Sequence, residues 1–166
     1  MTRDKKIAII ATNLIRQSSM NHDQWRATSI GAIHANPPIP VTLEDDEHPL
    51  VSASLPEGDW YVWTTRKLIG VCDGKHYEAK AESIVRGEFG NFKGSPQFLN
   101  VTAGPINTLV ATLYSNRGVA ACIRYETGYA AMAPIQCLKY WELKHPILDK
   151  LMIPEELAAY RQAKNN

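Results

Sequence analysis

The sequence has little of several features that would narrow its function. It contains three cysteines among 166 residues, an odd and sparse set that does not suggest a disulfide framework. Its net charge is only +1, so no overall field attracts nucleic acid or an anionic membrane. No stretch approaches the roughly 20 consecutive apolar residues of a membrane-spanning helix. We therefore expect neither a nucleic-acid nor a membrane partner.

Common catalytic and cofactor motifs are also absent. The chain has no GxxxxGKS/T, GxGxxG, HExxH or GxSxG sequence and no EF-hand loop. Such motifs hold a phosphate, a metal or a nucleophile at a fixed spacing, so we predict no cofactor. The first residues are basic and then apolar, but the apolar run Ile7–Ala11 is too short for a secretory signal peptide. This favours a cytoplasmic location.

What is present is the composition of a globular protein, with 45% hydrophobic and 21% charged residues. Near the N-terminus, Ile7, Ile10 and Leu14 recur at helical spacing, which predicts an amphipathic helix over residues 4–18. A strand over residues 6–11 is the alternative. A second helical pattern covers residues 23–35 and ends at a proline-rich stretch, because proline lacks the amide that a helix needs.

The next part of the chain has β character. Alternating side chains predict strands at Leu50–Leu55 and Lys75–Ala81, and β-branched or aromatic residues predict strands at Trp60–Thr65 and Leu68–Cys72. Asp73-Gly74 lies between the strands predicted at Leu68–Cys72 and Lys75–Ala81. Asp-Gly readily adopts the positive φ angles of a type I′ turn, so this is the strongest hairpin prediction in the chain.

The C-terminal third mixes both patterns. Residues 86–97 are rich in glycine and predict a loop that Phe89 and Phe92 anchor to the core. Helical spacing after Pro105 predicts a helix over residues 106–113, with Gly118 as its C-terminal cap. Further elements are expected in this order: a strand at Val119–Tyr125, a segment at residues 129–133 that pairs back, and helices beginning at Pro134 and Pro154.

These patterns predict an α+β fold, in which an antiparallel sheet of about four to six strands has helices from both termini packed on it. We expect a single domain over residues 1–166, because a helical arm of about 35 residues cannot bury a core alone. Its parts are a helical N-terminal arm (1–36), a linker (37–49) and a mixed body (50–166).

Cys72 and His76 are the weak candidates for catalysis. They flank the predicted hairpin turn, and a thiolate beside an imidazole base is the arrangement of a nucleophilic pair. With Cys122 they also have the ligand types of a zinc site. The alternative is a buried structural cysteine and an exposed histidine, because free cysteine is among the most buried residue types.

Aromatic residues suggest a binding surface. Trp60 and Trp63 point to opposite sides of one strand, and Tyr77 lies on the next hairpin. Exposed aromatics near basic residues stack on bases, nucleotides or peptides. The alternative is a central strand covered on both faces by helices.

The glycine-rich segment Gly87–Gly94 suggests a second binding element. Backbone amides together with Arg86 and Lys93 could close over an anion, whereas the alternative is a mobile surface loop. Arg124 and Tyr129 belong to a polar and aromatic group on a strand that we expect near this loop.

Two short pieces resemble plasmid antirestriction proteins. Gly58–Trp63 is similar to a Gly-x-Trp strand of that family, and Leu109–Tyr114 is similar to its apolar Thr-Leu helix. Met132-Ala133-Pro134 resembles a further family segment but follows the helix instead of preceding it. The resemblance covers about a dozen residues of this chain, and it implies an antirestriction function as one alternative.

We therefore predict a small non-catalytic binding or inhibitory module that recognises a small molecule or a protein through an aromatic sheet face and neighbouring loops. A homo-oligomer is compatible with the sequence. The alternative is a transferase or hydrolase with its site between the Gly87–Gly94 loop and the Cys72–His76 hairpin.

Overall fold

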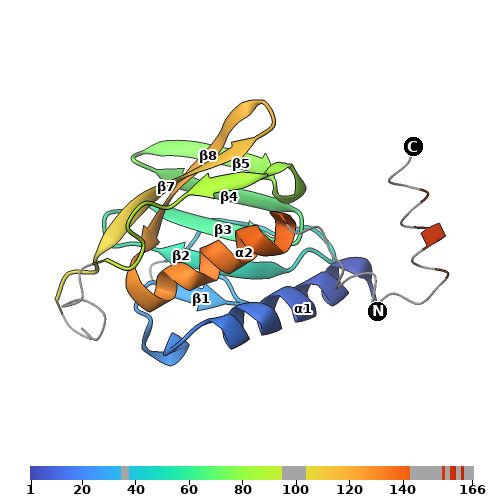
Figure 1. The fold of residues 1–166 in the computed structure, drawn as a ribbon, viewed down its shortest axis with the longest axis horizontal. Helices are drawn as coiled ribbons and strands as arrows, with labels where there is room; N and C mark the ends of the chain where they lie inside the picture. Colours follow the sequence, from blue (N-terminus) through green and yellow to red (C-terminus); the bar gives the residue numbers. More distant parts are fainter. Residues whose placement is uncertain (35–37, 95–103, 143–154, 156–157, 160–161, 163–166) are drawn as a thin grey trace.

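The computed structural model describes residues 1–34, 38–94, 104–142, 155, 158–159 and 162. These residues form two antiparallel sheets and two α-helices, which confirms the predicted α+β class (Figure 1). The predicted helix from Pro154 lies outside the continuously described ranges. In chain order the elements are α1 (Arg3–Ser18), β1 (Thr28–Ile30), β2 (Pro49–Ser54), β3 (Trp60–Thr64), β4 (Lys67–Cys72), β5 (Lys75–Lys80), β6 (Arg86–Glu88), β7 (Thr108–Ser115), β8 (Gly118–Glu126) and α2 (Met132–Glu142).

The larger sheet has the order β1-β2-β3-β4-β5, with all neighbours antiparallel. The strands predicted from alternation and β propensity are present, and the Asp73-Gly74 hairpin is confirmed. In this turn φ is +50° at Asp73 and +75° at Gly74, which are the positive values that a type I′ turn requires. The hairpin therefore follows from local chemistry alone.

The smaller sheet, β6-β7-β8, corrects the prediction of a helix over residues 106–113. Thr108, Val110 and Thr112 alternate with apolar residues there, and this period of two allows β7 to pair along its whole length with β8. Gly118 has φ +116° and serves the hairpin turn, not a helix cap. The segment Leu109–Tyr114, which resembles a family helix, is accordingly a strand.

Two other segments differ from the prediction. The predicted helix over residues 23–35 is wrong for its described part, residues 23–34: a short 3-10 helix at His22–Gln24 is followed by β1, which pairs with β2. The carboxylate of Glu126 accepts hydrogen bonds from the amides of Arg26 and Ala27, so these amides are satisfied without a helix. The predicted glycine-rich loop begins instead with β6, and Phe89 and Phe92 pack on the core as expected.

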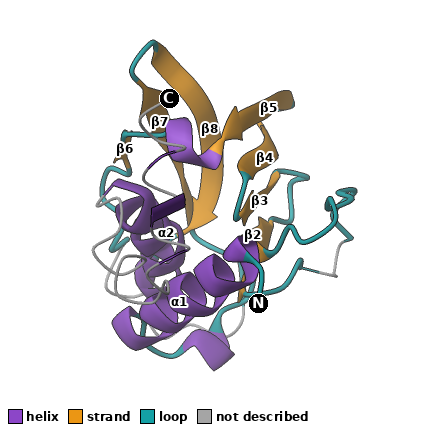
Figure 2. Cartoon of the chain, turned by 90° about the vertical axis from the view of Figure 1, so that its right-hand side faces the viewer, coloured by secondary structure: helices purple, strands orange, loops and turns teal. Residues whose placement is uncertain are grey.

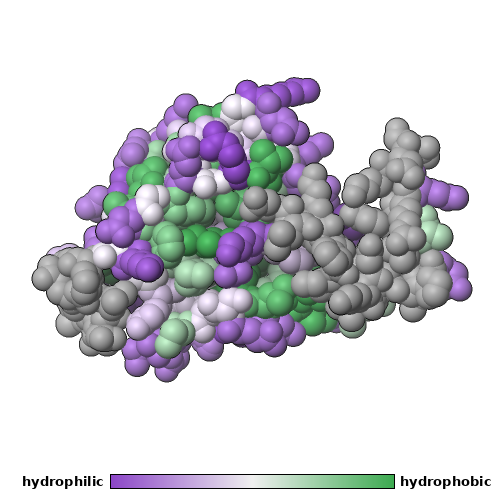
Figure 3. All heavy atoms as spheres, viewed as in Figure 1, coloured by the Kyte–Doolittle hydropathy of each residue, from purple (hydrophilic) through white to green (hydrophobic). Residues whose placement is uncertain are grey.

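Both helices lie on the same side of the larger sheet (Figure 2). Helix α1 buries Ile7, Ile10 and Ile15, which confirms the helix and rules out the alternative strand. Helix α2 begins at Met132, so residues 129–133 do not pair back as a strand. Side chains of α1, α2 and both sheets share one hydrophobic cluster. Apolar residues gather across the middle of this face of the molecule, where α2 lies, and hydrophilic residues dominate the β7–β8 tip (Figure 3).

We call the opposite side of the larger sheet, which carries Ser52, Trp60 and Val62, the outer face. The connector after β1 covers part of it: Ser52 Oγ donates to the carbonyl of Ala32 and accepts from the amide of His34, both at 2.8 Å. Ser52 and Val62 are fully buried as a result. Among the described residues, no helix is both long and apolar enough to cross a bilayer.

Candidate functional site

The structure separates the two catalytic candidates. The register pairs Cys72 with Lys75 and Val71 with His76. Paired residues share a face of a sheet, and successive residues alternate between faces, so Cys72 lies on the side of the sheet that β8 crosses and His76 lies on the outer face. Cys72 is buried and His76 is exposed. The thiol and the imidazole therefore do not form a nucleophilic pair in this structure.

Cys72 should behave as a protonated, unreactive thiol. Burial, followed by the nearby charges of Asp73 and Asp59, raises its pKa to about 11. At about pH 8 we expect alkylation by iodoacetamide to be roughly 200-fold slower than for a free thiol of pKa about 8.5, because little thiolate is present. Peptide mass spectrometry over a pH series would measure it, with the rate rising as the pH approaches 11. Rapid labelling near neutral pH would contradict this expectation and favour the enzyme alternative.

Arg124 joins two hairpin turns. Its Nε donates to Asp59 Oδ2 at 2.8 Å and its Nη2 donates to Asp73 Oδ1 at 2.6 Å. Asp59 is buried, and its other carboxylate oxygen accepts from the backbone amide of Asp73 at 3.0 Å. These hydrogen bonds, first that to Asp59, raise the pKa of Arg124. The guanidinium therefore holds the β2–β3 and β4–β5 turns together, and its donors are largely occupied.

Tyr77 lies close to this network. A hydrogen bond between its phenol and the Cys122 sulfur raises the pKa of Tyr77, and the Lys75 ammonium is 5.1 Å from the centre of its ring. Of the predicted site residues, the structure thus brings together Cys72, Tyr77 and Arg124 where β8 crosses the larger sheet. Their polar groups are bonded to neighbouring protein groups, Arg124 to Asp59 and Asp73 and Tyr77 to Cys122, which gives the cluster a structural role.

The two tryptophans have different environments. Trp63 and its neighbour Tyr61 are fully buried under the helices, and neither Trp63 Nε1 nor the Tyr61 hydroxyl has a hydrogen-bond partner among the described residues. Burial raises the pKa of Tyr61 well above its ordinary value. Trp60 lies on the outer face and is only half-buried. Only Trp60 of this pair can contact a partner directly.

The remaining predicted binding residues, Arg86, Lys93 and Tyr129, lie at two separate positions. Arg86 stacks on the Tyr114 ring, with 3.8 Å between the guanidinium carbon and the ring centre, and donates to Glu88 at 2.9 Å. Lys93 and Tyr129 lie on adjacent backbone segments, because the amide of Gly128 donates to the carbonyl of Phe92 at 2.8 Å. These residues do not join the Cys72 cluster into one site.

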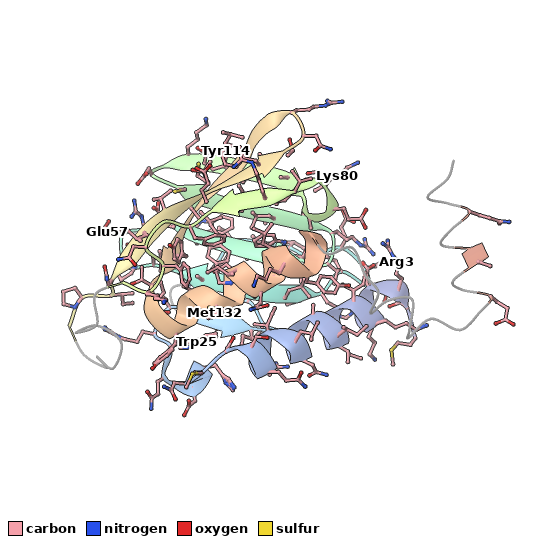
Figure 4. All side chains as sticks on the ribbon, viewed as in Figure 1. Arg3, Trp25, Glu57, Lys80, Tyr114 and Met132 are labelled. Carbon is pink, nitrogen blue, oxygen red and sulfur yellow. The ribbon has the colours of Figure 1, made fainter. Side chains whose placement is uncertain are left out.

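A cavity that the sequence did not predict opens at the end of the molecule where α1 begins, near the labelled Arg3 and Lys80 (Figure 4). Its volume is about 510 Å³, within the size range of small-molecule sites. The first turn of α1, the β3–β4 turn and the ends of β4 and β5 line it. Because these segments are far apart in sequence, no local motif could have identified it.

Comparison with known proteins gives no further guidance: no family model, no curated protein and no solved structure matches this chain. Within the described part of the chain, no group of three or more histidine, cysteine or acidic residues is placed to hold a metal ion.

Proposed function

We propose that this chain is a cytosolic, non-catalytic binding module that recognises a protein partner through the outer face of β3, β4 and β5. The observation that carries the proposal is the position of Trp60, half-buried on that face and paired in register with Val71. Ile69 lies two residues from Val71 on the same face and is also half-buried. Together, Trp60, Ile69 and Val71 form what we call the apolar strip.

The apolar strip has the anatomy of a protein–protein contact. His76 pairs with Val71, and Glu78 pairs with Ile69, so exposed polar side chains border it. Interfaces concentrate binding energy in a few central residues, with tryptophan strongly enriched, and surround them with a polar rim. This arrangement favours a macromolecular partner over a small ligand, because the strip lies on a sheet face.

The sheet also holds Trp60 in place before any partner arrives. Asp59, the preceding residue, is fixed by Arg124 and by the amide of Asp73. The strand that begins at Trp60, β3, pairs with β2 along one edge and with β4 along the other. An anchor that is already ordered costs less entropy on binding, which supports a recognition role for this position.

The test begins with capture of partners from a lysate of the source cells, followed by purification of an identified partner and measurement of its Kd. We expect Trp60→Ala to weaken binding by roughly 30-fold or more, the size of a central interface residue. Val71→Glu should weaken binding at least as much, since it places a charge in the apolar strip.

Trp25→Ala is the matched control, because Trp25 is also half-buried but lies before β1, away from the apolar strip. It should bind like the parent protein, and circular dichroism should show all three variants folded. Unchanged affinity in both Trp60→Ala and Val71→Glu would refute the proposed surface.

A further inference from the structure

The cavity beside Lys80 shares Glu78 with the border of the apolar strip, but the inference drawn from it does not rest on the proposed binding module. Most of its charged groups already have partners. Arg3 pairs with Glu82 at 2.9 Å, and Arg66 pairs with Asp4 at 2.6 Å. Lys67 lies 3.8 Å from the buried carboxylate of Glu47, outside the cavity lining.

Two charged groups that line the cavity, one positive and one negative, have no such partner in the described part of the chain. Lys80 and Glu78 have no ion-pair partner among the described residues. They are two residues apart on β5 and so lie on the same face of the strand, with their Cα atoms about 7 Å apart. The cavity therefore offers an uncommitted ammonium and an uncommitted carboxylate side by side.

The register explains why an anionic group would be stabilised at Lys80. Lys80 is directly opposite Lys67 across β4 and β5, and like charges at directly paired positions are destabilising. Glu47 already lies 3.8 Å from the Lys67 ammonium and offsets part of this repulsion, so a ligand carboxylate would act mainly on Lys80. A simple anion such as phosphate would also meet Glu78, whereas a ligand with its own ammonium group would satisfy that carboxylate.

We propose that this cavity binds a small zwitterion of the amino-acid type, with its carboxylate toward Lys80 and its ammonium toward Glu78. The volume of about 510 Å³ also accommodates a side chain or a second residue. The contacting charges are exposed and each contributes little, so the affinity should be about millimolar.

Titration of the ¹⁵N-labelled full chain with the common L-amino acids, followed by NMR, tests the proposal. Concentrations up to about 20 mM cover the expected Kd. Saturable amide shifts are expected at Lys67 and at Glu78–Lys80. The N-acetyl derivative lacks the ammonium and the amide derivative lacks the carboxylate, so each should bind about three- to fivefold more weakly.

Charge variants separate a specific site from general attraction. Lys80→Ala and Glu78→Ala should each weaken binding about three- to fivefold, while Lys75→Ala, at the far end of the same strand, should leave it unchanged. The exchanged pair Glu78→Lys with Lys80→Glu should bind better than either single reversal. The proposal is overturned if no amino acid gives saturable shifts, or if inorganic phosphate or the N-acetyl derivative binds as tightly as the free amino acid.

Discussion

Glu126→Ala should lower the free energy of unfolding by about 4 kcal/mol. The substitution removes a buried carboxylate that accepts three hydrogen bonds and leaves their donors without an acceptor. The carboxylate accepts from the amide of Arg26 at 2.9 Å, from the amide of Ala27 at 3.1 Å and from Thr28 Oγ1 at 2.9 Å. Glu126 is 8% exposed, so water cannot readily replace it. The midpoint of urea unfolding should fall by about 2 M.

Glu126→Gln provides a graded comparison in case the alanine variant does not fold. Its amide oxygen can replace one carboxylate oxygen, but its NH₂ group would face a donor, so the loss should be intermediate. Hydrogen exchange should accelerate at the amides of Arg26 and Ala27 in both variants. Glu57→Ala, an exposed acid in the β2–β3 turn, should change stability by less than about 0.5 kcal/mol. Equal effects at positions 57 and 126 would contradict this account.

Gly70→Ala should destabilise the protein by about 3 kcal/mol, although alanine is small and Gly70 is in a regular strand. A Cβ atom at position 70 would lie 2.4 Å from the carbonyl oxygen of Trp60 and 3.0 Å from the Cα of Tyr61. These are backbone atoms of the paired strand β3, so the sheet itself must move to relieve the overlap. Urea unfolding followed by tryptophan fluorescence would measure the loss.

Gly87→Ala is the matched control for this prediction. Its Cβ would meet Leu113 Cδ2 at 2.7 Å and Leu138 Cδ2 at 2.9 Å, and both are the ends of side chains that can rotate. The loss should therefore be smaller, about 1 kcal/mol. If Gly87→Ala is as damaging as Gly70→Ala, the close approach of β3 and β4 is not what requires glycine at position 70.

The candidate site was only partly predictable from sequence. Proximity along the chain correctly indicated that Cys72, Tyr77 and the hairpin turn belong together. It could not show which face each side chain occupies, since that depends on the register of β4 with β5. The register puts His76 on the outer face, and the same alternation leaves Trp60 accessible while it buries Trp63.

The cavity could not be predicted from the sequence at all. Its charged groups come from the start of α1, from the β3–β4 turn, from β4 and β5 and from the residues just after β5, and none of these segments carries a motif. Pairing with Glu82, Asp4 and Glu47 decides which charges remain available. Only the assembled structure could identify Lys80 and Glu78 as the uncommitted pair.

Local chemistry by itself determined several elements of this protein. Asp73-Gly74 needs no distant contact to favour its turn, because its positive φ angles are a property of these two residues. The stripe of Ile7, Ile10 and Ile15 likewise specifies a helix with one apolar face. In both cases the deciding interactions lie within a few residues along the chain.

Tertiary structure decided the segments whose patterns fit two structures. Leu109 and Leu113 are four residues apart, a spacing that suits one face of a helix and also one face of a strand, and pairing with β8 selected the strand. Residues 26–28 are not helical because Glu126, about a hundred residues later, accepts hydrogen bonds from two of their backbone amides and from the Thr28 hydroxyl. Such partners are distant in sequence, so no local window contains the interaction that determines the outcome.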